Sequence, residues 1–168
     1  MKIKDNFLPE VAFEKIFKLM TSSMFPWYYQ ISQTVDKKEK DKSYLSHLIY
    51  SNNMPQSNNY EDIMLPILFA LDEPKSLISC RANLYINRNE VYKSNYHTDD
   101  CDEENKWNHK TALFYVTENN GYTEFKNGKK VESKKNRLCI FDASEEHRAV
   151  SQTDEDRRIL ININYIEK

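Results

Sequence analysis

The sequence predicts a mainly β domain, a sandwich or jelly roll, preceded by helices. Seven short runs of strand-forming residues follow residue 77, and turn-forming residues separate them. Asn127-Gly128 lies between two of these runs and is a strong signal for a two-residue hairpin. Two segments with helical spacing of apolar residues precede the runs. At 168 residues the chain is most simply one domain, 1–168, in which 1–76 form a helical N-terminal support for a β core of 77–166.

The two helical segments are 8–20 and 60–71. Pro9 can occupy the first turn of the first segment. Pro66 lies inside the second, so we expect a kink or a late start there. The apolar positions that should form one buried stripe on each helix are Val11, Phe13, Ile16, Phe17 and Met20 in the first, and Ile63, Leu65, Ile67, Leu68 and Leu71 in the second.

The strand-forming runs define the β core. They are 77–87, 111–117, 122–125, 130–133, 137–141, 148–151 and 158–165. An earlier strand-like stretch, 44–50, contains His47, which we expect to be structural. The last run is the most informative, because side chains alternate between the two faces of a strand. Its two faces carry Ile159, Ile161 and Ile163 on one side, and Arg158, Leu160, Asn162 and Asn164 on the other. A buried polar face is costly unless something pairs with it, and a dicarboxylate ligand would do so.

Composition narrows the function classes. The formal charge of −2 and the pI near 6.1 give no electrostatic attraction toward a long nucleic acid or an anionic membrane. No apolar run approaches the length that spans a bilayer, and the start of the chain lacks the apolar region of a signal peptide. The sequence has three cysteines, an odd number, and no Cys-x-x-Cys motif, which argues against a set of disulfides or a structural zinc site. They are Cys80, Cys101 and Cys139. We expect a cytoplasmic protein, and the bias toward Lys, Asn, Ile and Tyr would suit a virus or phage in its host.

A candidate metal site lies in Asn95–Asp100, at the end of an extended segment. His97 and Asp99 are two residues apart, so in a strand both side chains point to one face. His147 follows fifty residues later. Two imidazoles and one carboxylate form the facial triad of non-haem Fe(II) oxygenases, which leaves one coordination face open. Asp100 and Asp102 are rival carboxylates, but Asp100 would point away if the strand continues.

Other polar residues near the triad have simpler interpretations. We expect His109 to be a surface or strand-entry residue rather than a ligand. The acidic cluster before His147, formed by Asp142, Glu145 and Glu146, is most simply a solvated turn.

The motifs around the triad resemble those of the 2-oxoglutarate/Fe(II)-dependent oxygenases, most closely the prolyl-4-hydroxylase-like branch and its small phage-type members. The resemblance covers about residues 77–166 and, more loosely, the N-terminal helices. The matching pieces are Arg81-Ala-Asn-Leu-Tyr85, Ala112-Leu-Phe-Tyr115, Asn120-Gly-Tyr-Thr-Glu-Phe125 and Asn136-Arg-Leu-Cys-Ile-Phe141. The resemblance implies an α+β, mainly β fold, the double-stranded β-helix or jelly roll, with N-terminal helices packed on one sheet.

The resemblance also implies roles for individual residues and three small reactants: Fe(II), 2-oxoglutarate as cosubstrate, and O2. The catalytic metal ligands would be His97, Asp99 and His147. Arg158 would bind the distal carboxylate of 2-oxoglutarate through its planar fork. Tyr115 would share that carboxylate, and Tyr85 would contact the cosubstrate near the metal.

Three departures bear on these roles. Asn136 replaces a usual glycine, and Leu160 stands where many relatives have Ser or Thr. Arg157 is a rival for the arginine role, but alternation places its side chain with the isoleucines, so we prefer Arg158.

The implied activity is hydroxylation of an unidentified substrate, either a peptidyl side chain such as proline or a small molecule, with release of succinate and CO2. Retention of Asp99 favours hydroxylation, because related halogenases replace that carboxylate. The loop Cys101–Lys110, with Trp107, is either a substrate lid or a disordered charged loop. Two alternatives stay open: a non-catalytic cupin-like or viral structural jelly roll, and an enzyme that oxidises nucleotides or nucleobases. The sequence leaves the oligomeric state open.

Overall fold

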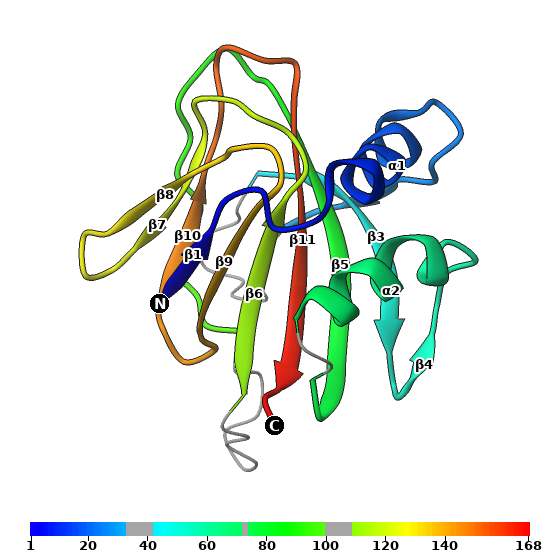
Figure 1. Ribbon diagram of the computed structural model, residues 1–168. Helices are drawn as coiled ribbons and strands as arrows, with labels where there is room; N and C mark the ends of the chain where they lie inside the picture. Colours follow the sequence, from blue (N-terminus) through cyan, green and yellow to red (C-terminus); the bar gives the residue numbers. More distant parts are fainter. Residues whose placement is uncertain (33–41, 72–73, 100–108) are drawn as a thin grey trace.

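Two antiparallel sheets and two helices make up the protein. In the computed structural model, which describes residues 1–32, 42–71, 74–99 and 109–168, the larger sheet has eight strands and the smaller has three. Helices α1 and α2 lie on one side of the large sheet, and the small sheet stands apart from them (Figure 1). The chain is therefore mainly β with two helices, as predicted.

The elements have the following bounds. The helices are α1 (Glu10–Thr21) and α2 (Tyr60–Ala70). The strands are β1 (Lys2–Lys4), β2 (Tyr28–Gln30), β3 (Tyr44–Ser51), β4 (Met54–Pro55), β5 (Ser76–Ile86), β6 (Lys110–Tyr115), β7 (Tyr122–Phe125), β8 (Lys130–Glu132), β9 (Arg137–Asp142), β10 (His147–Val150) and β11 (Arg157–Ile166). All seven predicted runs form strands. The segment before residue 76 adds β1 to β4, so it contributes edge strands as well as helices.

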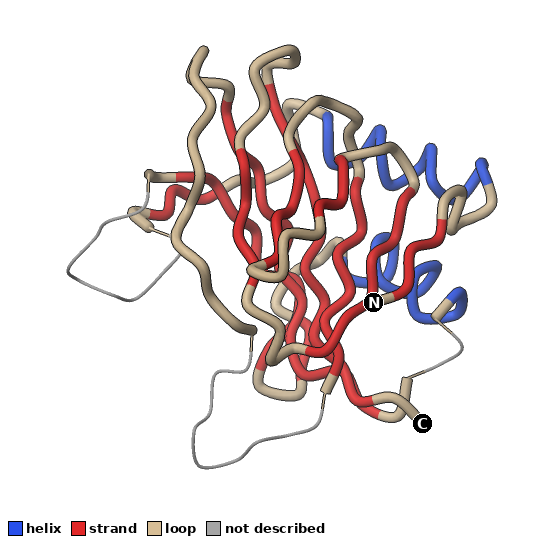
Figure 2. Tube along the Cα trace, turned by 90° about the vertical axis from the view of Figure 1, so that its left-hand side faces the viewer, coloured by secondary structure: helices blue, strands red, loops and turns tan. Residues whose placement is uncertain are grey.

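The large sheet is ordered β1-β9-β6-β11-β5-β3-β2, with β4 paired to β3. Strand β11 lies between β5 and β6, and the three isoleucines of its apolar face are fully buried. They pack in one core with residues of α1 and α2, among them Ile16, Met20 and Ile63. Figure 2 shows both helices on the same side of the strands. The isoleucine face of β11 therefore packs against the two helices.

The small sheet is ordered β10-β7-β8. A second core contains residues from the opposite face of the large sheet and from the small one: Leu113, Tyr115, Phe125, Val131, Cys139, Phe141 and Leu160. Leu160 and Arg158 lie on the same face of β11, so Arg158 also faces the space between the two sheets.

The helices depart from the sequence prediction in detail. Val11, which we expected in the buried stripe of α1, is 73% exposed. The buried residues of this helix are Phe13, Ile16 and Met20. In α2, Leu65 is 40% exposed, and the helix begins at Tyr60, so a late start is wrong. Neither helix of the described residues is long and apolar enough to cross a bilayer.

Two turns bear on the sequence predictions. The β7–β8 hairpin turns over three residues rather than two, because Phe125 N donates to Lys129 O at 2.9 Å and Gly128 takes a φ of 87°. A three-residue loop that ends in a left-handed residue is a common hairpin type. Ahead of β9, Asn136 has a φ of 58°, a conformation that favours glycine or asparagine. This explains how Asn136 stands where the resembling family has glycine.

Candidate metal centre

The three predicted metal ligands come together through an antiparallel bridge. The segment that contains His97 pairs with the start of β10: His97 N donates to His147 O at 3.0 Å, and His147 N donates to His97 O at 2.9 Å. Asp99 N donates to Ala143 O at 3.0 Å, in the turn between β9 and β10. Alternation then places the side chains of His97 and Asp99 on the same side, facing His147.

The ligand atoms of His97, Asp99 and His147 all lie within 4.8 Å of one another. Asp99 Oδ2 is 3.7 Å from His147 Nε2, and Asp99 Oδ1 is 4.0 Å from His97 Nε2. The side chains are 29%, 12% and 4% exposed for His97, Asp99 and His147, so the cluster opens to solvent on the His97 side. Two imidazoles and a carboxylate that converge from one side are the donor set that suits Fe(II) with open positions.

The tautomers of both histidines are set by backbone carbonyls. His147 Nδ1 lies 2.9 Å from Glu145 O, and His97 Nδ1 lies 3.4 Å from Asn95 O. Each Nδ1 therefore carries the hydrogen, which leaves the lone pair of Nε2 directed toward the cluster. Burial lowers the pKa of His147, although the charge of Asp99 acts in the opposite direction. The neutral imidazole, which is the form that binds metal, is favoured.

Asp99 is held by two side chains of the large sheet. Thr111 Oγ1 lies 3.0 Å from Asp99 Oδ2, and Asn162 Nδ2 donates to the same oxygen at 3.1 Å. Thr111 Oγ1 also lies 2.8 Å from Asn164 Oδ1, and its single hydrogen can serve one of the two acceptors at a time. Both of these contacts are to Oδ2, while Oδ1 is the oxygen that lies 4.0 Å from His97 Nε2.

Arg158 is fully buried between the sheets. Its Nε donates to Ser133 Oγ at 2.6 Å, and one Nη donates to Thr123 Oγ1 at 3.2 Å. The other nitrogen, Nη1, is buried without a hydrogen-bond partner. None of the ion pairs among the described residues involves Arg158, and burial lowers its pKa. A buried guanidinium without a carboxylate is costly, so its surroundings suit an anionic ligand.

Two tyrosines flank the Arg158 guanidinium. Its Cζ lies 5.4 Å from the ring centre of Tyr85 and 5.9 Å from that of Tyr115. The hydroxyl of Tyr115 donates to Thr123 Oγ1 at 2.8 Å, and burial raises the Tyr115 pKa to about 12, so the phenol stays neutral. Tyr85 pairs with Arg158 across the two strands. It therefore stands beside Arg158, whereas the sequence led us to expect it near the metal.

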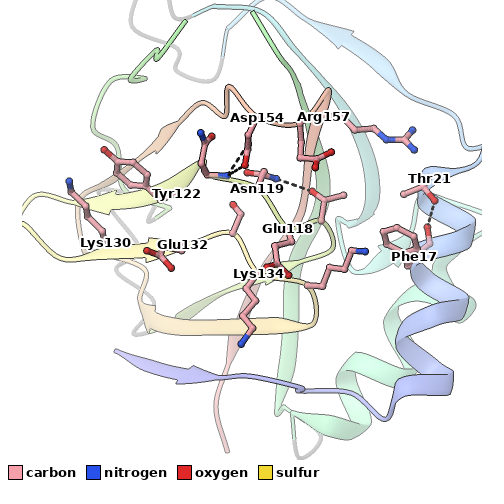
Figure 3. Close-up of a pocket in the computed structure, with 15 residues that line it drawn as sticks. Phe17, Thr21, Glu118, Asn119, Tyr122, Lys130, Glu132, Lys134, Asp154 and Arg157 are labelled. Carbon is pink, nitrogen blue, oxygen red and sulfur yellow. Dashed lines mark hydrogen bonds between the residues drawn. The ribbon is translucent and has the colours of Figure 1, made fainter. Parts of the chain in front are cut away.

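Arg157, the rival arginine, points elsewhere. It is exposed and lines an open groove of about 930 Å³ with Phe17 and Thr21 of α1 (Figure 3). No residue of the metal cluster lines this groove. Its charges also balance, with four basic residues, Lys130, Lys134, Lys135 and Arg157, against four acidic ones, Glu118, Glu132, Asp154 and Glu155. The groove favours neither an anion nor a cation.

The remaining histidines stand apart from the metal cluster. His47 is buried, with its two ring nitrogens 2.8 Å from Pro26 O and 2.7 Å from Ser57 Oγ, which fits the predicted structural role. His109 precedes β6, as expected of a strand-entry residue, but it is buried rather than on the surface. Its carbonyl accepts a hydrogen bond from Ala143 N at 3.2 Å.

The acidic turn before His147 is at the surface. Asp142 forms an ion pair with Lys110, and Glu146 pairs with Lys126 at 2.6 Å. Asp100, Asp102 and Trp107 lie outside the described residues, as does most of the Cys101–Lys110 loop.

Sequence reasoning missed several residues that contact the predicted ones. Thr123 and Ser133 hold the Arg158 guanidinium, and Thr111 holds Asp99. Their types and spacing carry no signal, because the contacts depend on which strands pair and on the distance between the two sheets. Asn162 was placed on the correct face by alternation alone.

The fold is shared with solved oxygenase structures. A prolyl-4-hydroxylase from Pseudomonas putida matches 99% of this chain and 92% of its own at 13% identity, with a TM-score of 0.63. The viral collagen prolyl hydroxylase of Paramecium Bursaria Chlorella virus-1 matches over 99% and 90% at 15% identity, with a TM-score of 0.58. A Trichoplax adhaerens prolyl hydroxylase, solved with a hypoxia inducible factor peptide fragment, matches over 99% and 83% at 14% identity, with a TM-score of 0.63. No family model matches the chain, and no curated protein sequence matches it.

At these identities the matches establish the fold. The resemblance to the prolyl-4-hydroxylase-like branch, drawn from sequence motifs, is confirmed at that level.

Proposed function

We propose that this chain, which has the fold of the prolyl hydroxylases, is an Fe(II)- and 2-oxoglutarate-dependent dioxygenase built on a double-stranded β-helix. His97, Asp99 and His147 would hold the iron, and Arg158 would bind the distal carboxylate of 2-oxoglutarate. Bound Fe(II) and 2-oxoglutarate would supply an O2-dependent oxidation coupled to release of succinate and CO2. The substrate would be hydroxylated.

The observation that carries the proposal is the Arg158 guanidinium. It is fully buried, it keeps one nitrogen without a partner, and it lies beside the core between the sheets whose Phe125 and Phe141 contact the ring of His147. A carboxylate would satisfy Nη1 and neutralise the charge, and the planar fork can bind it in bidentate fashion. A metal-free structural jelly roll would have no reason to bury an unpaired cation there. This disfavours the non-catalytic alternative.

Each residue of the pocket has a task that its contacts support. Thr123 and Ser133 fix the guanidinium, and Tyr115 keeps a neutral phenol beside it. Thr111 and Asn162 hold Asp99 by one oxygen, so that the other is presented to the metal. The side chains are thereby oriented before any ligand arrives, which reduces the free energy needed to order the site.

A peptidyl side chain, proline first, is the substrate we propose. The structural neighbours from Pseudomonas, the chlorella virus and Trichoplax are all prolyl hydroxylases by name, and the last was solved with a peptide. The balanced charge of the chain gives no support to a long nucleic-acid substrate.

Anaerobic ligand binding tests this proposal directly. Purified protein would receive Fe(II) and then 2-oxoglutarate, and the weak visible charge-transfer band of the chelate would be recorded. We expect the band in the wild type and in Arg157→Ala. Arg158→Ala should lose it at the same cosubstrate concentration, because the ligand's distal carboxylate loses its counter-charge. Circular dichroism would establish that both variants are folded.

Turnover supplies the second measurement. In air, the iron-loaded wild type should form succinate from 2-oxoglutarate, slowly without substrate and faster with one. A folded wild type that gives neither the band nor succinate would refute the oxygenase assignment. The non-catalytic jelly roll would then be the better hypothesis. A band that survives in Arg158→Ala and disappears in Arg157→Ala would move the cosubstrate to the other arginine.

A further inference from the structure

Strand β5 presents a row of three polar side chains to the candidate site. In the register with β11, Arg81 lies opposite Asn162, Asn83 opposite Leu160, and Tyr85 opposite Arg158. Directly opposite residues of antiparallel strands share a face. The intervening residues of β5, Cys80, Ala82 and Leu84, are buried in the core on the helix side. Arg81, Asn83 and Tyr85 therefore face the space that contains the metal cluster.

Two guanidinium groups thus face this space at different levels. Arg158, opposite Tyr85, marks the buried position along β5. Arg81 lies four residues away along β5, about 13 Å at the rise of a strand. Its partner in the register, Asn162, donates to Asp99 Oδ2, so Arg81 stands at the level of the metal ligands. Because the five-carbon cosubstrate would extend between Arg158 and the metal, Arg81 is left for the other participant in the reaction.

The charge of Arg81 is unneutralised. The residue is exposed, and none of the hydrogen bonds or ion pairs of the described structure involves its guanidinium. Cations on two other strands are paired: Lys110 of β6 with Asp142 and Glu167, and Arg148 of β10 with Glu124. The guanidinium of Arg81 can therefore bind one carboxylate with two parallel hydrogen bonds.

Asn83 supplies a second unsatisfied group between the two arginines. Its Oδ1 is buried without a hydrogen-bond partner. A buried acceptor of this kind needs a donor. 2-Oxoglutarate carries two carboxylates and a ketone, and none of them can donate. The N–H of a peptide can.

We propose that Arg81 and Asn83 form a subsite for an acidic peptide, in which Arg81 binds the carboxylate of a glutamate or aspartate and Asn83 Oδ1 accepts a backbone N–H. The subsite rests on the proposed function and specifies its substrate class: a peptide whose hydroxylated residue has an acidic neighbour. A bare carboxylic acid of small size would use Arg81 without using Asn83.

Matched peptides test the subsite. Blocked heptapeptides with a central proline flanked by glutamates would be compared with the same peptides carrying glutamines, by calorimetry on anaerobic protein loaded with Fe(II) and 2-oxoglutarate. In the wild type, the glutamate peptide should bind at least about threefold more tightly, as expected of a solvent-accessible ion pair. Arg81→Ala should reduce this ratio to about one, and Arg81→Lys should retain part of it.

Arg88→Ala is the control for net charge. Arg88 is exposed just beyond β5, where one Nη donates to Ser43 O at 2.8 Å, so this variant removes one positive charge outside the subsite. It should keep the full glutamate preference. N-acetylglutamate and N-acetylglutamine, titrated in parallel, separate a peptide substrate from a free acid.

The outcomes distinguish the subsite from the function it rests on. Absence of the chelate band in the wild type would overturn the oxygenase assignment itself. With the band present, peptides that do not bind, equal binding of the two peptides, or a preference that survives Arg81→Ala would overturn the subsite alone. Discrimination between the acetylated amino acids without discrimination between the peptides would overturn the peptide as the occupant.

Discussion

Replacement of Asn136 should destabilise the protein by an amount that depends on the new residue. Asn136 is buried with a φ of 58°. Its side chain makes two buried hydrogen bonds to the N-terminal segment: Leu8 N donates to Oδ1 at 2.9 Å, and Nδ2 donates to Leu8 O at 2.9 Å. Asn136→Gly keeps the backbone conformation and removes both bonds, whereas Asn136→Ala removes both bonds and also puts a residue there that adopts a positive φ less readily than asparagine or glycine.

The expected magnitudes follow from these two effects. Two buried hydrogen bonds contribute about 1 kcal/mol each, so Asn136→Gly should lower the free energy of unfolding by about 2 kcal/mol. Alanine lacks the polar side chain that lets asparagine tolerate a positive φ, which adds about 1 kcal/mol and brings Asn136→Ala to about 3 kcal/mol. The expected order of stability is wild type, then Asn136→Gly, then Asn136→Ala.

Urea denaturation of the three proteins measures these differences. Asn89 provides the control, because it has a φ of 56° but is exposed in a loop after β5. Asn89→Ala should therefore cost about 1 kcal/mol, the backbone contribution alone. A glycine variant at 136 as stable as the wild type would refute the role given to the Leu8 hydrogen bonds. An alanine variant as stable as the glycine one would refute the backbone argument.

Three further predictions concern the metal centre and the ion pair of Asp5, just after β1. Asn162→Ala removes one donor to Asp99 and should weaken Fe(II) binding by about tenfold, measured by titration against a chelator; unchanged affinity would exclude a positioning role. His147→Ala should abolish stoichiometric iron binding while His109→Ala keeps it, and the opposite result would require a different triad. The hydrogen bond from Arg137 lowers the pKa of Asp5 to about 2. The Asp5–Arg137 ion pair therefore stabilises the fold above about pH 4 and stops doing so as the pH falls toward 2. Because that carboxylate is partly exposed, Asp5→Asn should cost below about 1 kcal/mol at pH 7 and nothing near pH 2, by urea denaturation.

The sequence by itself determined the features that depend on local periodicity. Strand β11 is the best example, since alternation separated Arg158 from Ile159 and assigned each to the correct face. The same rule brought His97 and Asp99 to one side. Their local patterns suffice because a strand turns its side chains to opposite faces whatever it pairs with.

Tertiary structure decided what depends on partners distant in the chain. The contacts of Thr123 and Ser133 with Arg158 join β7 and the end of β8 to β11 across two sheets, and no spacing in the sequence encodes that approach. The free guanidinium of Arg81 faces the metal cluster only because Arg81 pairs with Asn162, and a register shifted by one residue would turn it to the helix side. Strand pairing is set by the packing of the whole core, and so the second half of the site could be found only in the folded protein.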